Sequence, residues 1–253
     1  MDRADEHWKA LIDEKIGQVF SDIEAPPPIS ITQPADNLFP STIDHTLLKP
    51  DATAEQIDQL CSEALEYQFK SCCVNGANIE QVAKRLRGSS TTIPCAVIGF
   101  PMGACTTAVK AFEAQDAIRN GAREIDMVIN IGALKSQYYN VVFSDIYTVV
   151  QAVSSSTIPV KVILETALLT DGEKVAGAFI AAEAGAAFVK TCTGFNGGGA
   201  TKEDVIKLFK TVRYKGGKVK VKASAGIRSF EKCLEMLRAG ADRIGTWVYA
   251  WDF

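Results

Sequence analysis

Two lysines stand at the ends of two strand candidates, and each follows a valine and precedes small residues. Lys190 ends the run at 188–190, and Lys222 ends the run at 218–222. Each pattern predicts a buried strand that brings one amine to the mouth of a loop. A single lysine of this kind is usually a solvated surface residue. Two such lysines together suggest that two amines face one pocket.

Two amines in one pocket favour covalent chemistry. A lysine side chain is protonated at neutral pH because its free pKa is about 10.4. A neighbouring ammonium group and partial burial both disfavour that charge and so free the lone pair. The free amine can attack a carbonyl and form a Schiff base. The protonated imine is an electron sink, so a neighbouring carbon–carbon bond can be made or broken.

Carboxylates inside apolar runs are the second candidate group. Asp126 lies within the apolar segment 124–129. Burying a carboxylate alone is costly, so Asp126 is expected to form a salt bridge with a lysine, to carry a proton, or both. Glu165 has the same ambiguity, with a buried structural pair favoured. Cys73 has no evident histidine partner and is interpreted as a wall of the pocket.

A glycine run offers a candidate phosphate site. Gly197, Gly198 and Gly199 precede a helix that is expected to begin near Thr201. Free amides at a helix N-terminus suit a phosphate, although three glycines are equally typical of a flexible loop. Gly226 and the loop after residue 245 could complete the site, because barrels often bind phosphate beside their last two strands.

From residue 41 onward, short apolar runs alternate with amphipathic segments. The strand candidates are residues 42–44, 71–74, 95–100, 124–129, 160–165, 187–190, 219–223 and 243–246. The helix candidates are residues 53–67, 78–86, 106–120, 136–153, 171–184, 201–214 and 229–239. The alternation indicates parallel βαβ units, and eight strands favour closure into a (β/α)8 TIM barrel. Reacting groups in such barrels lie at the C-terminal ends of the strands, which places the candidate carboxylates, thiol and lysines on one face.

The two ends of the chain differ from a plain barrel. Residues 3–23 show helical spacing of apolar positions, and a proline-rich linker follows. We therefore expect an arm over 1–40 and a barrel domain over 41–253. After the last strand candidate only residues 247–253 remain, which is too few for an eighth helix. That flank should be open, or covered by the arm or by a second subunit.

Composition limits the class of function. The chain has 253 residues and a formal net charge of −3 without a long basic run, so neither nucleic acid nor an anionic membrane is an expected partner. The seven cysteines are scattered and the first residues are charged, which favours free thiols in the cytoplasm. The only histidines are His7 and His45, so a zinc site built on several histidines is not available.

Five segments together resemble one known family. They read IDHTLLKP at 43–50, EIDMV at 124–128, KVILET at 161–166, FVKT at 188–191 and VKAS at 221–224. In this order they are similar to deoxyribose-phosphate aldolase. The resemblance implies a class I aldolase without metal or cofactor that interconverts 2-deoxy-D-ribose 5-phosphate with acetaldehyde and D-glyceraldehyde 3-phosphate.

The resemblance also implies roles for individual residues. Lys190 matches the Schiff-base lysine, Lys222 the second lysine that lowers its pKa, and Asp126 the proton-relay aspartate. Asp44 matches a carboxylate of the pocket network, and Cys73 a pocket cysteine. With the loop residues, the expected substrate-binding set is Asp44, Cys73, Thr193, Gly198, Gly199, Ala225 and Gly226.

The sequence departs from the family pattern in two places. Ala225 stands where the family usually has a glycine, and an aromatic tail replaces the small residues after the last strand. We therefore expect weakened phosphate recognition, and the aromatic tail suggests a subunit contact, as in a homodimer. Three alternatives stay open: a catalytically impaired barrel that binds sugar phosphates, another Schiff-base aldolase, and a transaldolase.

Overall fold

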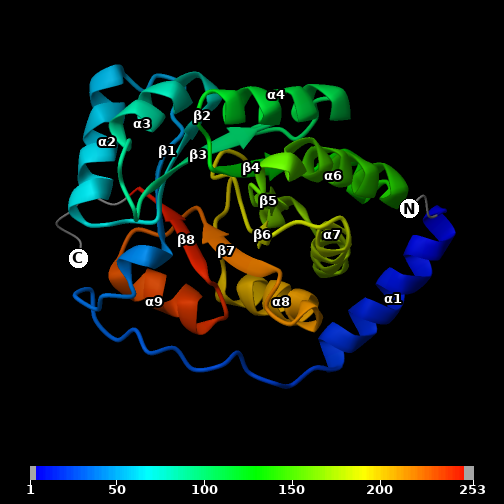
Figure 1. Cartoon of the computed structure of the whole chain (residues 1–253). Coiled ribbons are helices and arrows are strands. Elements are labelled where there is room, and N and C mark those ends of the chain that lie inside the picture. Colours follow the sequence, from blue (N-terminus) through cyan, green and yellow to red (C-terminus); the bar gives the residue numbers. More distant parts are fainter. Residues whose placement is uncertain (1–3, 248–253) are drawn as a thin grey trace.

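A closed barrel of eight parallel strands forms the centre of the molecule, and the computed structural model describes residues 4–247 (Figure 1). The strands are β1 (Ile43–Leu47), β2 (Ser71–Asn75), β3 (Ile93–Ile98), β4 (Glu124–Val128), β5 (Val160–Ile163), β6 (Phe188–Lys190), β7 (Lys220–Ser224) and β8 (Arg243–Thr246). β8 pairs with β1 and closes the sheet, with Asp44 opposite Gly245. The (β/α)8 TIM barrel predicted from the sequence is confirmed.

Helices follow the strands and cover the outside of the barrel. They are α2 (Ala54–Glu66), α3 (Ile79–Arg85), α4 (Thr107–Arg119), α5 (Ile131–Lys135), α6 (Tyr139–Val153), α7 (Asp171–Glu183), α8 (Lys202–Val212) and α9 (Phe230–Arg238). α2 and α7 each begin with a capping box, at Thr53 and Thr170, which satisfies amides that the first turn leaves free.

A short helix that the sequence did not predict, α5, precedes the helix expected over 136–153. The expected segment contributes only to α6. Between α5 and α6, Gln137 adopts a positive φ of 59°, which an α-helix cannot continue through. The sequence contains no glycine or proline at this break, so the local residue types did not indicate it.

Side chains alternate between the barrel interior and the helices along each strand. In β1, Asp44 reaches other strand residues, whereas the next residue, His45, contacts Glu63 of α2 with Nε2 and Oε2 2.6 Å apart. The outer layer is mainly aliphatic and forms the large hydrophobic core. The inner layer contains charged residues, and these build the candidate site.

The N-terminal helix α1 (Asp5–Ser21) packs against α6, α7 and α8 of the same chain (Figure 1). Trp8 is fully buried, with its ring 5.2 Å from that of Phe143 and 6.2 Å from that of Phe179. The linker then passes beneath α8 and α9, where Phe39 packs edge-on against Phe230. α1 therefore covers the side of α6 to α8 and not the flank beside β8.

The expectations of a missing eighth helix and of a subunit contact rest on the aromatic tail at 247–253. Trp247 lines the cavity described below, and residues 248–253 lie outside the described residues. Within 4–247, no helix is long and apolar enough to span a lipid bilayer.

Candidate active site

The register of β6 and β7 brings the two predicted lysines together. Lys190 and Lys222 are directly paired across these strands. Each amine donates to the same oxygen, Oδ2 of Asp126, at 2.8 Å. Asp126 comes from β4, which β5 separates from β6 in the barrel. The two amines and the carboxylate singled out in the sequence therefore meet at one point.

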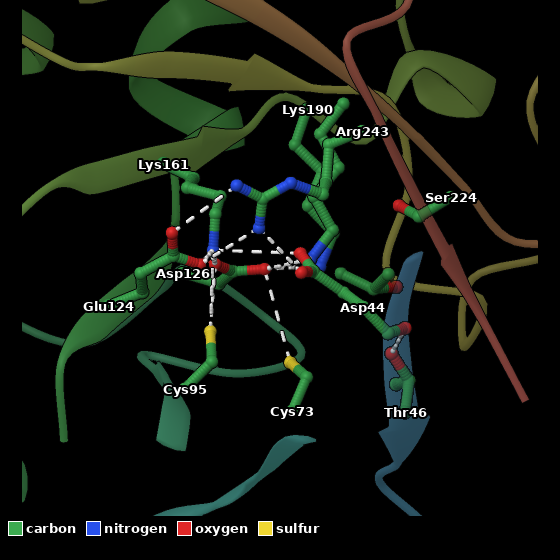
Figure 2. A network of polar contacts seen from close by, with 12 residues as sticks. Asp44, Thr46, Cys73, Cys95, Glu124, Asp126, Lys161, Lys190, Ser224 and Arg243 are labelled. Carbon is green, nitrogen blue, oxygen red and sulfur yellow. Dashed lines mark hydrogen bonds and ion pairs between the residues drawn. The ribbon is translucent and has the colours of Figure 1, made fainter. Parts of the chain in front are cut away.

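A third lysine, which the sequence reasoning did not single out, completes the contacts of this carboxylate. Lys161 of β5 lies opposite Asp126 in the β4–β5 register, and its Nζ is 2.7 Å from Asp126 Oδ1. The same amine is 2.6 Å from Glu124 Oε2 (Figure 2). Three lysines from three strands thus share one aspartate.

Asp44 anchors the other side of the network. Its Oδ2 is 2.5 Å from Lys222 Nζ, and its Oδ1 is 2.6 Å from Nη1 of Arg243. Ser71 also donates its hydroxyl to Oδ1, at 2.6 Å. Arg243 reaches Glu124 as well, at 3.2 Å, and so closes a ring of charges across the barrel (Figure 2).

The charges of this ring hold one another in their ionised forms. Burial alone raises the pKa of Asp126, but Lys161, Lys190 and Lys222 outweigh it and hold this pKa well below its usual range. Burial alone lowers the pKa of Lys222, but Asp126 and Asp44 outweigh it and raise this pKa. The pKa of Lys161 is raised in the same way, and that of Asp44 is lowered mainly by Lys222 against the effect of burial. Lys222 is therefore an ammonium group.

A cavity of about 180 Å³ opens above the ring at the C-terminal ends of the strands. Its walls come from the ends of β1, β6, β7 and β8 and the loops that follow them. The lining residues are Thr46, Leu48, Lys190, Cys192, Thr193, Ser224, Ala225, Gly226, Ile227, Arg228, Gly245, Thr246 and Trp247. Lys190 is the one lysine among them: its side chain is 3% exposed, whereas those of Lys161 and Lys222 are 0% exposed.

The predicted substrate-binding residues fall into three groups. Thr193, Ala225 and Gly226 line the cavity. Asp44 and Cys73 are fully buried below it, and the Cys73 thiol lies 4.0 Å from Asp126 Oδ2.

Gly198 and Gly199 form the third group, because they support the cavity wall without lining it. A Cβ at Gly199 would lie 2.8 Å from the carbonyl oxygen of Ala225, and one at Gly198 2.7 Å from the Cβ of Ala167. The glycine run therefore lets the loop after β6 lie against the loops after β5 and β7.

The N-terminus of α8 differs from a free anion site. The Thr201 side chain already accepts the amide of Asp204, and Glu203 and Asp204 occupy the first turn. Both acids would repel a phosphate there. The cavity is lined instead by Arg228, which is exposed and follows β7. Sequence reasoning missed Arg228, although an arginine two positions after Gly226 was an available signal.

Glu165 lies apart from the charged ring and organises the loop after β6. It follows β5 with a left-handed backbone, φ 60°. Its carboxylate accepts hydrogen bonds from the hydroxyl and the backbone amide of Thr193. It also accepts one from the side-chain amide of Asn196, at 2.9 Å. Glu165 therefore positions Thr193 at the cavity wall by hydrogen bonds, in place of the buried pair expected from the sequence.

Gly245 makes room for the second lysine. A Cβ built on Gly245 of β8 would lie 2.9 Å from Cε of Lys222 and 2.9 Å from Cβ of Ser224. Such a contact is too short for either atom to stay in place. The extended Lys222 side chain therefore fits beside β8 because this position has no side chain.

One group of possible metal ligands occurs among the described residues, and it lies in this ring. Thiol and carboxylate atoms of Cys73, Cys95 and Asp126 lie within 4.8 Å of one another. Asp126 is already in contact with three lysine amines, two of which have raised pKa values. A divalent cation would be repelled by these ammonium groups, so the donor set does not suit a metal.

Comparison with known proteins identifies the family. The sequence pattern of the DeoC/LacD family aldolases matches residues 41–246. The chain belongs to this family. It is therefore an aldolase, a carbon–carbon lyase, and the resemblance found in the sequence is confirmed.

Named relatives and solved structures agree with this assignment. The chain is 57% identical to a deoxyribose-phosphate aldolase of Staphylococcus haemolyticus, over 80% of this chain and 90% of that one. It is 55% identical to the enzyme of that name from Clostridium tetani, over 80% and 92%. A crystal structure from Coccidioides immitis, described as a candidate deoxyribose-phosphate aldolase, superposes with a TM-score of 0.90 at 39% identity and covers 97% of this chain and 94% of that one.

Proposed function

We propose that this aldolase cleaves 2-deoxy-D-ribose 5-phosphate reversibly to acetaldehyde and D-glyceraldehyde 3-phosphate, with Lys190 as the Schiff-base residue. One observation carries the assignment of Lys190. Lys190 is the lysine that lines the cavity. Its amine also donates to Asp126, the carboxylate that binds Lys222. A substrate carbonyl in the cavity can reach Lys190 and neither of the other two amines.

The proposed reaction begins when the neutral amine of Lys190 attacks the C1 aldehyde and water leaves. The resulting iminium draws electrons from the C2–C3 bond as the C3 hydroxyl loses its proton. D-glyceraldehyde 3-phosphate departs, and a two-carbon enamine stays on Lys190. Asp126, with Lys222 and a water molecule, returns a proton to C2, and hydrolysis then releases acetaldehyde.

The charges of the ring support this course. The ring contains the carboxylates Asp44, Glu124 and Asp126, and the cations Lys161, Lys222 and Arg243 besides Lys190. With Lys190 neutral, three negative and three positive charges balance. The iminium adds a positive charge beside Asp126, whose carboxylate is already in place to stabilise it.

Phosphate recognition is proposed at the mouth of the cavity. Arg228, Ala225 and Gly226, which follow β7, line the cavity, and an arginine can bind a phosphate through charge-assisted hydrogen bonds. Ala225 holds a left-handed backbone, φ 74°, which places a methyl group where a glycine would leave open space. We infer that phosphate binding is weaker than a glycine at this position would permit.

We also propose a cellular location, an oligomeric state and domain boundaries for this chain. A cytoplasmic enzyme is consistent with seven free cysteines, six of them buried, since thiols persist in reducing compartments. A homodimer remains our proposal for its assembly; a similar structure from Aeropyrum pernix is described as a tetrameric deoxyribose phosphate aldolase. We also propose that residues 1–40 are an arm on a barrel domain spanning 41–253.

Borohydride trapping tests the proposed function. The protein is incubated with 2-deoxyribose 5-phosphate and borohydride, and modified peptides are mapped by mass spectrometry. We expect a reduced adduct on Lys190 and none on Lys110, a buried lysine outside the ring. Product analysis separates this reaction from that of a transaldolase or another Schiff-base aldolase. A folded protein without an adduct would instead be a sugar-phosphate-binding barrel.

A further inference from the structure

Lys161 is a buried lysine that the proposed reaction does not use. Its side chain is 0% exposed and does not line the cavity, so it cannot touch the substrate. Its Nζ nevertheless lies 2.7 Å from Oδ1 of Asp126, the carboxylate assigned to proton transfer. Any effect of Lys161 on the reaction must therefore pass through Asp126.

The two oxygens of Asp126 have different partners. Oδ1 faces Lys161 and the thiol of Cys95, at 2.7 and 3.3 Å. Oδ2 faces Lys190 and Lys222, both at 2.8 Å. A carboxylate held at only one oxygen can rotate about its last bond and let the two oxygens exchange places. Because Lys161 holds Oδ1, Oδ2 stays at the junction of the two lysines.

Lys161 is itself firmly held. Its amine lies 2.6 Å from Glu124 and 3.4 Å from the Cys95 sulfur, besides its contact with Asp126. Glu124 is fixed in turn by Arg243, at 3.2 and 3.4 Å. These contacts raise the pKa of Lys161 despite its burial, so it carries its charge throughout the reaction. A fixed ammonium group at this place can both orient Asp126 and keep it ionised.

We propose that Lys161 is a positioning residue that aims Oδ2 of Asp126 at the proton-transfer step on the two-carbon enamine. The inference rests on the proposed function of Lys190 and Asp126. The proposal predicts different effects of Lys161 on two steps of the reaction, imine formation and proton exchange at C2. Imine formation needs the amine of Lys190 and the open cavity, which Lys161 does not touch. Proton exchange at C2 needs a correctly placed Asp126.

The test replaces Lys161 by methionine and measures both steps with acetaldehyde alone. Imine formation is read as the fraction of Lys190 labelled by borohydride. Proton transfer is read as deuterium exchange into the acetaldehyde methyl group in D2O. We expect Lys161→Met to lower exchange about 10²-fold, the lower end of general acid–base contributions. Labelling should stay within about threefold of the unmodified protein.

Lys110→Met is the matched control. Lys110 is also fully buried, and its amine lies 2.5 Å from Asp145, between α4 and α6 and away from the ring. Removing it breaks a buried lysine–carboxylate ion pair, as Lys161→Met does, so it reproduces a general loss of stability. The ratio of exchange to labelling should be unchanged in this variant.

A double variant keeps the proposal testable if Lys161→Met does not fold. Lys161→Met with Glu124→Met removes one charge of each sign, which is often tolerated better than a broken pair. It should show the same loss of exchange with retained labelling. Exchange and labelling that fall together, or that both persist, would overturn the proposal. So would failure of both variants to fold, which would assign Lys161 to the fold alone. Absence of labelling in the unmodified protein would contradict the proposed function instead.

Discussion

Lys190 and Lys222 lie directly opposite each other on neighbouring strands, and their amines donate to the same oxygen of Asp126. The resemblance to the family predicted that the second lysine would act on the first. The structure shows how the two are made unlike. Lys222 is also held by Asp44 at 2.5 Å and is sealed from the cavity, whereas Lys190 reaches it. The two lysines are chemically identical, but they differ in their ion-pair partners and in their access to the cavity.

Replacing each of the two lysines by methionine should have different effects. Lys190→Met removes the amine that lines the cavity, so no reduced adduct should form and activity should be lost. Lys222→Met leaves Lys190 in place but removes the ammonium beside it, and activity should fall about 10²–10⁴-fold. A coupled assay for the released triose phosphate, with mapping of the adduct, checks both. An adduct on Lys222 in the Lys190→Met protein would contradict the assignment.

Replacing Arg228 should affect recognition of the phosphate and leave the chemistry intact. A charge-assisted hydrogen bond is worth about 1.5–3 kcal/mol, so Arg228→Met should raise KM for 2-deoxyribose 5-phosphate about 10–100-fold. The value of kcat/KM for unphosphorylated 2-deoxyribose should not change. Arg238→Met, at the exposed end of α9, is the matched control. An equal loss with both substrates would show that Arg228 does not recognise phosphate.

The contribution of Asp44 to stability should depend on pH. Its pKa is depressed in the folded protein, so its contribution is fully present above the unfolded value of about 3.9 and is lost as the pH falls further. Asp44→Asn should lower the free energy of unfolding by about 3–5 kcal/mol at neutral pH, because buried cations lose their partner. Below about pH 4, as Asp44 of the unfolded chain takes up its proton, the difference should shrink.

Urea denaturation at several pH values measures this difference. Asp116→Asn, which breaks an exposed pair with Arg119, is the control and should change stability by less than about 1 kcal/mol. A difference for Asp44→Asn that stays constant down to pH 2 would mean that the ring does not hold this carboxylate ionised.

Gly245→Ala should disturb the site without replacing a charged residue. The added methyl group would lie 2.9 Å from Cε of Lys222, so the lysine or the strand must shift. Such overpacking costs about 1–3 kcal/mol of stability, and displacement of the amine should lower kcat at least about tenfold. Gly76→Ala, where a Cβ meets nothing within 4 Å, serves for comparison. Full activity in Gly245→Ala would show that Lys222 tolerates displacement.

The sequence allowed prediction of the elements more readily than of their contacts. Eight apolar runs specified the strands, since a buried parallel strand needs continuous apolar residues. Lys190 and Lys222 were conspicuous because each interrupts such a run just before a loop. Lys161 stands at the second position of its strand, after a proline and a valine, and there a lysine is typically solvated. Only the register with β4 shows that it faces Asp126.

The glycine run illustrates a second limit. Three glycines before a helix are compatible with an anion site, and that pattern guided the prediction. Gly199 instead lies close to the backbone of Ala225, where Ala200 donates its amide to the Ala225 carbonyl at 2.9 Å. The need for glycine arises from a neighbouring loop that is distant in sequence. Residue types alone do not reveal such packing between loops.

The position of α1 has a consequence for the order in which the chain can assemble during synthesis. Its docking surface is built from α6, α7 and α8, and the linker after it is fastened by an ion pair between Glu24 and Arg213, which are 189 positions apart. A ribosome releases α1 first but completes its partners only near the end of translation. Until then the apolar face around Trp8 has no native partner. α1 is therefore made well before it can reach its final place.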